Sequence, residues 1–299
     1  VRKNTAAGYQ VALEGNTLTG SSGYDVIFTT GDDGSYEAPS VKLNITGAEG
    51  LSVFPVHVAN IGDTYYTTLQ AAIDAANDGE TVTLLIDCDE DVTVVQASDK
   101  KITIDGNDKT MTGTITVDGK SAAYATAGLT IQNVNFVQDT ADQVFINLGG
   151  NSSTRYTSNV TVTGCTFTGT DKTAVGIKNY TGGCKNLTVE DCTATDVHSL
   201  IQVKGVDGLI VKDVTVTGGR GMSFGTSTNI EIDNATITAD SYGIRADGSG
   251  AYDLTVKNST ITAEMPIVVR KNTAAGYQVA LDGNTLTGSS GYDVIFTTG

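Results

Sequence analysis

The pattern of apolar and polar positions repeats in one eight-residue frame between Leu129 and Phe296. Positions 1, 3, 6 and 8 are mostly apolar, positions 2, 4 and 7 are mostly polar, and position 5 is Asn, Asp or Gly. Because successive side chains of a strand point to opposite faces, the frame predicts a strand, a one-residue bend and a second strand. The frame occurs as LTIQNVNF from Leu129, VTVTGCTF from Val160, LTVEDCTA from Leu187, LIVKDVTV from Leu209, IEIDNATI from Ile230, LTVKNSTI from Leu254 and VALDGNTL from Val279.

A third short apolar run follows most of these frames, and the starts of the frames lie 21 to 31 residues apart. Three strands per turn with no helix-length crossover predict a parallel β-solenoid, in which stacking of the turns makes one continuous core. Parallel connections are almost always right-handed, so we expect an all-β, right-handed parallel β-helix. The third runs are Ile146/Leu148, Ile201/Val203, Met222/Phe224, Ile267/Val269 and Val294/Phe296.

One segment has helical periodicity instead. Thr67 to Ala76 places Leu69, Ala72, Ile73 and Ala76 on one face, which predicts a short helix over about 67–77 with Thr67 or Thr68 as its N-cap. An exposed end of a solenoid aggregates through its apolar core and its strand edges. The helix is therefore expected to cover the N-terminal end of the stack.

The first 31 residues return almost unchanged at residues 269–299, with Glu14 in the first copy and Asp282 in the second. The offset of 268 residues and the single difference favour a natural tandem array. We expect residues 1–31 to be the last turns of one repeat, 32–62 to connect, and 63–299 to form the β-helix that ends in the second copy. The chain shows neither an initiator Met nor a signal peptide, which is typical of an internal piece of a longer protein.

The segment IGDTYYTTLQAAIDAANDGETVTLL, from Ile61 to Leu85, resembles the capping segment of the pectate-lyase-like right-handed β-helix superfamily. It is most similar to the version in large secreted and surface proteins of Gram-positive bacteria. Some members of that superfamily are polysaccharide lyases or glycosidases, and many others are adhesins or stalks. The resemblance implies an extracellular or cell-surface location in a bacterium.

Enzymes of the polygalacturonase type combine a paired Asp-Asp, a Gly-His-Gly and an Arg-x-Lys. This chain has a paired Asp only at Asp32-Asp33 and has neither of the other two motifs. If the chain were an enzyme, the catalytic candidates would be Asp196, His198, Arg220 and Asp240, with Tyr242 beside them, because stacked turns bring such groups together. The other histidine, His57, is expected on a strand surface.

Composition limits the partners. The chain has 34 Asp and Glu against 18 Lys and Arg, a net charge of −16, and no basic tract, which argues against a nucleic-acid partner. No apolar run is long enough to span a bilayer. Asp87, Asp89 and Asp91 alternate as in an EF-hand loop but lack its Gly and Glu, so we predict no metal site and no cofactor.

Cys165 and Cys192 occupy position 6 of adjacent frames and should stack in the core. They are predicted to be buried free thiols, and a disulfide between the two turns is the alternative. Position 5 should be a bend with a positive φ angle. Position 4 alternates in charge, which would fix the register of the stack. These charged residues are Glu190, Lys212, Asp233, Lys257 and Asp282.

Threonines recur in a Thr-x-Thr pattern on the outward face, which predicts a regular grid spaced about 4.8 Å by 6.7 Å. Such a grid resembles the ice-binding face of antifreeze solenoids, although stacked threonines are also favoured on any exposed strand. The pairs are Thr166/Thr168, Thr193/Thr195, Thr215/Thr217, Thr236/Thr238, Thr260/Thr262 and Thr285/Thr287.

The sequence therefore predicts a structural or adhesive repeat unit of an extracellular bacterial fibre or stalk. Its expected partners are neighbouring repeats of the same protein, end to end, and host or environmental glycans. The alternatives are a polysaccharide-active lyase or glycosidase on the same fold and an ice-binding protein that uses the threonine face.

Overall fold

A computed structural model describes residues 57–96, 99–119, 126–149, 156–179, 183–247, 253–270 and 278–297. It also describes the backbone of four short strands that precede them, β1 (Tyr9–Ala12), β2 (Val26–Ile27), β3 (Leu43–Thr46) and β4 (Val53–Phe54). The paired Asp32-Asp33 and most of the first copy of the 31-residue segment lie outside these residues.

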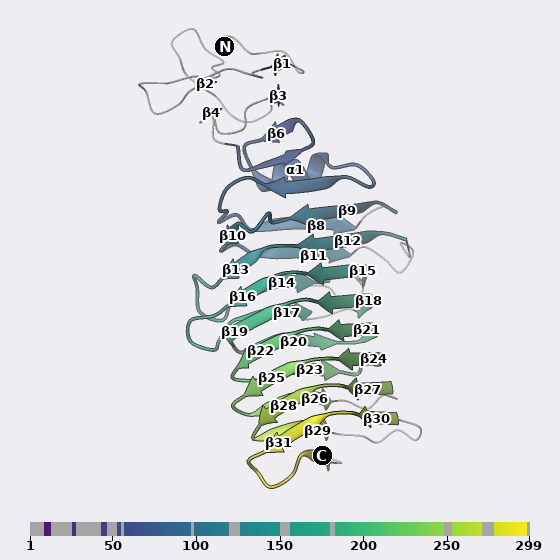
Figure 1. Ribbon diagram of the computed structural model, residues 1–299. Coiled ribbons are helices and arrows are strands. Elements are labelled where there is room, and N and C mark those ends of the chain that lie inside the picture. Colours follow the sequence, from purple (N-terminus) through teal and green to yellow (C-terminus); the bar gives the residue numbers. More distant parts are fainter. Residues whose placement is uncertain are drawn as a thin grey trace.

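The described strands form a solenoid of three long sheets, which the chain visits in a fixed order (Figure 1). Sheet 1 has thirteen strands, sheet 2 has eight and sheet 3 has nine. From β9 to β32 the described strands make eight full turns, each with one strand in every sheet. All pairings between these turns are parallel, which confirms the prediction of a parallel β-solenoid with three strands per turn.

The strands of sheet 1, beyond β1 and β3, are β5 (Ala59–Ile61), β6 (Thr64–Tyr66), β7 (Thr81–Leu84), β9 (Lys101–Asp105), β12 (Gly128–Gln132), β15 (Tyr156–Thr163), β18 (Gly183–Glu190), β21 (Val206–Lys212), β24 (Thr228–Asp233), β27 (Asp253–Lys257) and β30 (Gln278–Asp282). Those of sheet 2 are β10 (Thr110–Met111), β13 (Asn135–Val137), β16 (Thr166–Thr168), β19 (Thr193–Val197), β22 (Thr215–Gly218), β25 (Thr236–Ala239), β28 (Thr260–Ala263) and β31 (Thr285–Gly288). Those of sheet 3 are β8 (Val92–Gln96), β11 (Ile115–Gly119), β14 (Val144–Leu148), β17 (Val175–Asn179), β20 (Ser199–Lys204), β23 (Met222–Gly225), β26 (Tyr242–Asp247), β29 (Met265–Arg270) and β32 (Val294–Thr297).

The bend between sheets 1 and 2 is the position-5 residue of every frame, as predicted. Its φ angle lies between 52° and 63° in all seven frames. This left-handed conformation costs Asn, Asp and Gly less than other residues, which explains their selection at position 5. The seven residues are Asn133, Gly164, Asp191, Asp213, Asn234, Asn258 and Gly283.

A second column of bends was not predicted. It lies immediately before position 1 of four frames, at Asn159, Asn186, Gly208 and Asn229, and their φ angles run from 50° to 82°. The Asn186 side-chain amide donates to Asn159 Oδ1 at 2.8 Å, so the column is tied together from turn to turn. Each bend lies inside a strand of sheet 1, in β15, β18, β21 and β24, so it changes the direction of that strand before the frame begins.

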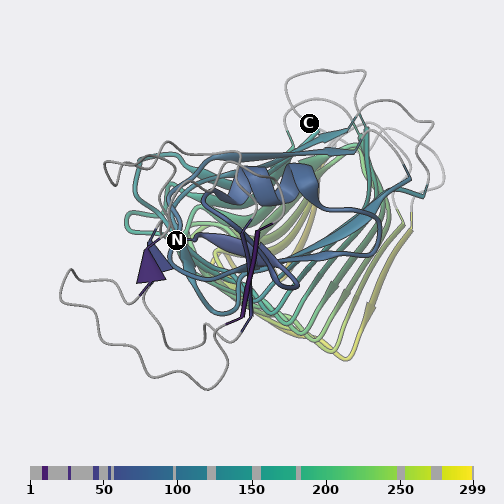
Figure 2. The ribbon, with the colours of Figure 1, turned by 90° about the horizontal axis from the view of Figure 1, so that it is seen from above.

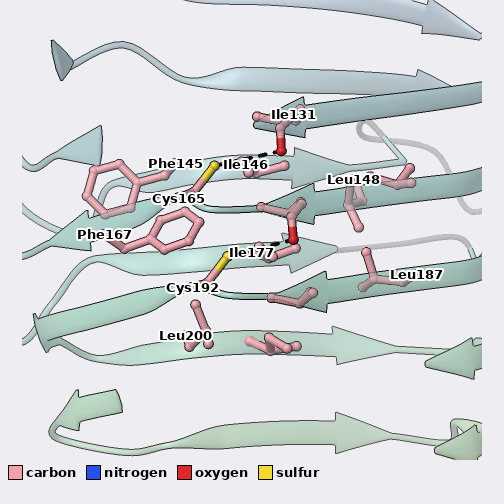
Figure 3. Close-up of a cluster of buried hydrophobic side chains, with 14 of the residues drawn as sticks. Ile131, Phe145, Ile146, Leu148, Cys165, Phe167, Ile177, Leu187, Cys192 and Leu200 are labelled. Atoms are coloured by element: carbon pink, nitrogen blue, oxygen red, sulfur yellow. Dashed lines mark hydrogen bonds between the residues drawn. The ribbon is translucent and has the colours of Figure 1, made fainter. Parts of the chain in front are cut away.

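The interior of the solenoid is a set of stacked apolar columns. The residues at position 6, Val134, Cys165, Cys192, Val214, Ala235 and Ser259, are each at most 1% exposed, which confirms the predicted inward column. Phe136 and Phe167 stack on adjacent turns at 5.1 Å between ring centroids, and Phe145 packs against both. Figure 3 shows the rings of Phe145 and Phe167 side by side. Because these apolar side chains are buried by contacts between turns, the stability of each turn depends on its neighbours.

All four cysteines are buried free thiols. This confirms the prediction that Cys165 and Cys192 are free thiols, and not the alternative of a disulfide between the two turns. The thiols of Cys165 and Cys192 lie on neighbouring turns, and each donates weakly to a backbone carbonyl, Cys192 to Glu190 O at 3.1 Å and Cys165 to Thr163 O at 3.4 Å. Cys165 also approaches Ile131 O at 3.7 Å (Figure 3). The adjacent Cys192 thiol and burial raise the pKa of Cys165. These thiols therefore act as small apolar side chains of the core.

The predicted helix is α1 (Leu69–Ala75), two residues shorter at each end than expected. Thr68 is its N-cap: Thr68 has extended backbone angles, and its side chain accepts from Ala71 N at 3.1 Å. Ala76 is already extended, so the helix ends before it. The Glu90 carboxylate also accepts from Leu69 N at 2.9 Å, which gives the helix a distant second cap.

The apolar face of α1 covers the N-terminal end of the stack (Figures 1 and 2). Leu69, Ala72, Ile73 and Ala76 are all buried, and the helix contacts strands β5 to β8. The helix therefore takes the place of a further turn and buries this end of the core.

Sheet 1 continues past this helix toward the N-terminus. Strand β5 pairs antiparallel with β7 and β6, β6 pairs antiparallel with β3, and β3 pairs parallel with β1. The expected boundary between residues 62 and 63 falls in the turn of the β5–β6 hairpin, where Gly62 has a φ of 54°. Sheet 1 therefore joins β1 of the first 31-residue copy to the β-helix, whereas β2 pairs with β4 in a separate two-stranded sheet.

The expected place of His57 on a strand surface was wrong. His57 is 8% exposed, lies just before β5 and contacts the Tyr65 ring at 5.3 Å between centroids. Its Nε2 atom has no hydrogen-bond partner among the described residues, and burial lowers the pKa of His57 to about 4. The hairpin covers this residue, which a pattern of isolated strands does not reveal.

The register can be tested in the position-6 column. Val214→Asp places a carboxylate without a partner in the core and should destabilise the protein by several kcal/mol, measured by urea unfolding. Thr215→Asp, one residue away on the exposed face, is the matched control and should change stability by less than about 1 kcal/mol. Equal effects at the two positions would mean that the inward column is wrongly assigned.

The buried histidine predicts a specific pH dependence. The folded-state pKa of His57 is about 4 against about 6.5 when unfolded, so the unfolded chain binds more protons as the pH falls between these values. His57 should therefore cost on the order of 2 kcal/mol of stability between pH 6.5 and 4. In His57→Phe, this pH-dependent part of the loss in the free energy of unfolding should be absent. Urea unfolding at pH 7 and at pH 4.5 measures it. An unchanged pH dependence would show that His57 is accessible to protons.

Candidate functional site

The candidate catalytic residues lie on the turns between sheets 2 and 3, at successive levels of the stack. Lys172 N donates to Asp196 O at 3.0 Å, Arg220 N to His198 O at 2.8 Å, and Ser241 N to Gly219 O at 3.1 Å. The backbone of each turn is thus hydrogen-bonded to the next. Asp196, His198, Arg220 and Asp240 therefore form one column along a single corner of the solenoid, which we call the corner column.

The two carboxylates of the corner column face a lysine that the sequence did not single out. Lys172 Nζ lies 2.7 Å from Asp240 Oδ2, although 68 residues separate them. Asp240 raises the pKa of Lys172 first through this hydrogen bond, and Asp196 adds a smaller effect. Both partners are exposed, so this is a surface ion pair of small energetic value. Lys172 itself has a φ of 60°, which only the structure reveals.

His198 is surrounded by positive charge rather than by the carboxylates. Burial lowers its pKa, and the charges of Arg220 and Lys178 lower it further, while Asp142 opposes them. The ring stays neutral at pH 7, with Nδ1 at 3.4 Å from Ser199 Oγ. Among the described residues, no hydrogen bond or ion pair joins His198 to Asp196 or Asp240. The structure thus aligns the candidates without pairing the imidazole with an acid.

Tyr242 lies between two guanidinium groups at the end of this column. Arg220 Cζ is 5.3 Å from the ring centroid and Arg245 Cζ is 5.5 Å from it. Arg245 also forms an ion pair with Asp247 on its own strand. Since the tyrosine is only 5% exposed, its ring supports the two cations and does not itself face solvent.

The threonine pairs lie on the outward face of sheet 2, in register over most of its length. In β28, Thr262 lies opposite Thr238 of the preceding turn and opposite Thr287 of the next turn. The described strands therefore carry two straight threonine columns from β22 to β31. The pairs in these columns are Thr215/Thr217, Thr236/Thr238, Thr260/Thr262 and Thr285/Thr287.

The expected regular grid was wrong at Thr195. This threonine is exposed and lies opposite Thr168 on the preceding turn, but Thr217 is not its partner on the next turn, because the register shifts by one residue within β19. Asp196, which follows it with a φ of 53°, lies in the resulting bulge. The bulge breaks the column that contains Thr195, whereas the column through Thr193 is continuous. Ligand binding by this face stays a prediction.

The alternating charges at position 4 are in register, but their ion pairs differ from the expectation. Lys257 Nζ lies 3.5 Å from Asp233 on the preceding turn and 2.6 Å from Glu231 beside it. Lys212, by contrast, contacts Asp213 of its own turn at 3.2 Å. The left-handed bend at Asp213 turns that carboxylate outward beside Lys212, so the local pair replaces the pair between turns.

Metal and ligand sites are scarce in the part of the chain that the structure describes. That part contains no group of three or more His, Cys, Asp or Glu able to hold a metal ion. Asp87 and Asp91 instead accept from Thr110 N and Thr114 N at 2.8 Å, so they fix the next turn. A groove of about 530 Å³ lies over β9 and β12, and among the described residues that line it Lys101 is the one that carries a charge. Within the described residues, no helix is both long and apolar enough to cross a membrane.

The comparison with known families agrees with this architecture. The family model described as "Right handed beta helix region" matches residues 114–291, which is 178 of the 299 residues. No curated protein and no solved structure matches the chain. The matched residues contain the complete turns from β12 to β31 and the whole corner column. The chain therefore belongs to the right-handed β-helix family.

Proposed function

We propose that this chain is a structural or adhesive repeat unit of an extracellular fibre or stalk on a bacterial surface. The observation that carries the proposal is the position of the repeated 31-residue segment. Its first copy supplies β1 at one end of sheet 1, and its second copy supplies β30 at the other end. The same sequence thus stands at both ends of one continuous sheet, which suits serial stacking of units.

The rest of the molecule supports a passive role. From β9 to β32 the strands of each turn pair only with those of the neighbouring turns, so stability adds along the axis and a long array stays stiff. The proposed partners are neighbouring repeats, end to end, and glycans outside the cell. The location outside a bacterial cell rests on the resemblance of residues 61–85 to the capping segments of surface proteins.

The proposal predicts the length that each unit adds. Sheet 1 has thirteen strands, so twelve strand spacings separate β1 from β30. At about 4.8 Å per spacing, each further unit should lengthen the particle by about 58 Å. Polypeptides with residues 1–31 followed by one, two or three copies of 32–299 would be compared by small-angle scattering and electron microscopy. Lengths that do not grow in proportion to copy number, or separate flexible beads, would contradict a stiff rod.

A polysaccharide-active enzyme is the second candidate, and the corner column favours it. This column gathers a neutral imidazole, one cation and two carboxylates along one edge, with Lys172 beside them, a set of groups suited to binding an acidic sugar and accepting a proton. Against it stands the missing contact between His198 and either carboxylate. The ice-binding alternative rests on the threonine grid, and the bulge at β19 works against its regular match to a lattice.

The two leading functions separate in one assay. The structural proposal predicts no cleavage of acidic or neutral polysaccharides by the wild-type chain, measured as new reducing ends and as absorbance of unsaturated products. Cleavage that His198→Gln lowers at least about tenfold would favour the enzyme, because a positioned base contributes about 10²-fold or more. Thr287→Ala, on the outer face of the last turn, is the matched control and should leave any activity unchanged.

A further inference from the structure

The C-terminal turn of the solenoid exposes apolar side chains that are buried one turn earlier. Leu281 in β30 is 40% exposed and Phe296 in β32 is 59% exposed. Their partners on the preceding turn, Val256 and Val269, are 0% exposed. The outer edge of β30 has no neighbour in sheet 1, where β30 is the last strand. This end of the core therefore lacks the cover that α1 gives the other end.

The same sequence has a cover at the N-terminal end. Residues 9–12 correspond to 277–280 and residues 26–27 to 294–295, since the two copies differ by an offset of 268. There β1 pairs parallel with β3, Val11 opposite Ile45, and β2 pairs parallel with β4, Val26 opposite Val53. Strands β3 and β4 thus already pair with the described strands of this segment.

The edges correspond as well as the sequences. Strand β1 is the first strand of sheet 1, and β3 lies on the side of β1 that faces the stack. Strand β30 is the last, with β27 on the side that faces the stack and nothing on the other. Along the common axis, β1 therefore binds β3 on the side that β30 leaves open. Three antiparallel pairings separate β3 from β7, so β1 and β3 run opposite to β30, and a second copy must be rotated by half a turn about the axis to present β3 parallel to β30.

We propose that the open C-terminal turn binds β3 and β4 of a second copy by parallel strand addition, with Val279 opposite Ile45 and Val294 opposite Val53. The inference names the partner segment for the end-to-end stacking in the proposed function and rests on it. Backbone hydrogen bonds from β30 provide affinity, and burial of Leu281 and Phe296 adds the apolar contribution. Such a head-to-tail contact does not close on itself, so it builds linear assemblies.

In a second copy of this chain, β3 is already paired with its own β1. Strand β30 of the first copy must therefore displace β1, whose sequence it shares. Two separate wild-type chains should therefore assemble little, because the new strand pairing replaces an equal one and gains no free energy of pairing. Weakening β1 alone should remove the competitor and favour assembly.

The test uses the full chain with Gln10→Pro/Val11→Pro, since proline cannot donate to the sheet and adjacent residues point to opposite edges. In sedimentation velocity at about 100 µM, we expect more than half of this variant in head-to-tail oligomers and the wild type mainly monomeric. Adding the matched changes Gln278→Pro/Val279→Pro to the same chain should return it to the monomer. Circular dichroism reports whether each variant is folded.

Register is tested by disulfide trapping in the Gln10→Pro/Val11→Pro background. Parallel partners have Cα atoms about 4.8 Å apart, within reach of a disulfide. Gln278→Cys with Asn44→Cys should link different chains, because Gln10, the equivalent of Gln278, faces Asn44. Gln278→Cys with Thr46→Cys, displaced by two residues, should link at least about fivefold less.

A folded Gln10→Pro/Val11→Pro variant that stays monomeric, or trapping that ignores register, would overturn the inference. Rods that lengthen by the expected step in the tandem polypeptides, without exchange between separate copies, would retain the proposed function and reject this pairing. Oligomers that persist with Gln278→Pro/Val279→Pro would show that another surface is responsible.

Discussion

No turn of this molecule can bury its own apolar row, and this constraint organises the whole structure. A single turn presents a few apolar side chains, which become a core only when the turns above and below cover them. The contrast between Val256, fully buried, and Leu281, its 40% exposed partner on the last turn, shows the effect of one missing neighbour. The helix α1 and the β5–β6 hairpin solve the problem at one end, and a further strand layer would solve it at the other.

Register follows from the bends rather than from the charges. A residue with a positive φ angle at position 5 fixes where each chain leaves sheet 1, so the next strand begins at the same place in every turn. The charges at position 4 fall into register because the bends place them there, yet Lys212 contacts its neighbour Asp213 in preference to the next turn. A surface pair contributes at most about 1 kcal/mol, whereas moving the bend by one residue reverses the faces of the strand.

The sequence predicted those features that repeat. Periodicity predicts the three strands per turn, the position-5 bends, the inward column at position 6 and the exposed threonines. The same pattern recurs in every turn, so each turn supports the interpretation of the others. Features that occur once, such as the bulge after Thr195, were missed or misplaced. His57 is buried because a hairpin folds over it, and Glu90 caps a helix some twenty residues before it in the chain, an arrangement that no local pattern encodes. The second column of bends, which begins at Asn159, does repeat. The sequence could have indicated it, because an Asn or a Gly stands immediately before each of these four frames.

The candidate site shows the same division. Stacking of the turns explains why Asp196, His198, Arg220 and Asp240 share one corner, and this followed from the spacing of the frames. The sequence did not indicate that Lys172 would contact Asp240, or that positive charge would surround His198. Both depend on side-chain directions at irregular turns.

Residue-resolved amide hydrogen exchange on the intact chain tests most directly the claim that each turn is stabilised by its neighbours. The account predicts the slowest exchange in the central turns, for example at Thr215, whose amide donates to Cys192 O at 3.0 Å. Protection should fall by at least about two orders of magnitude toward β30 to β32, because that turn has a neighbour on one side only. Uniform protection from β9 to β32, or faster exchange in the centre than at the end, would contradict it.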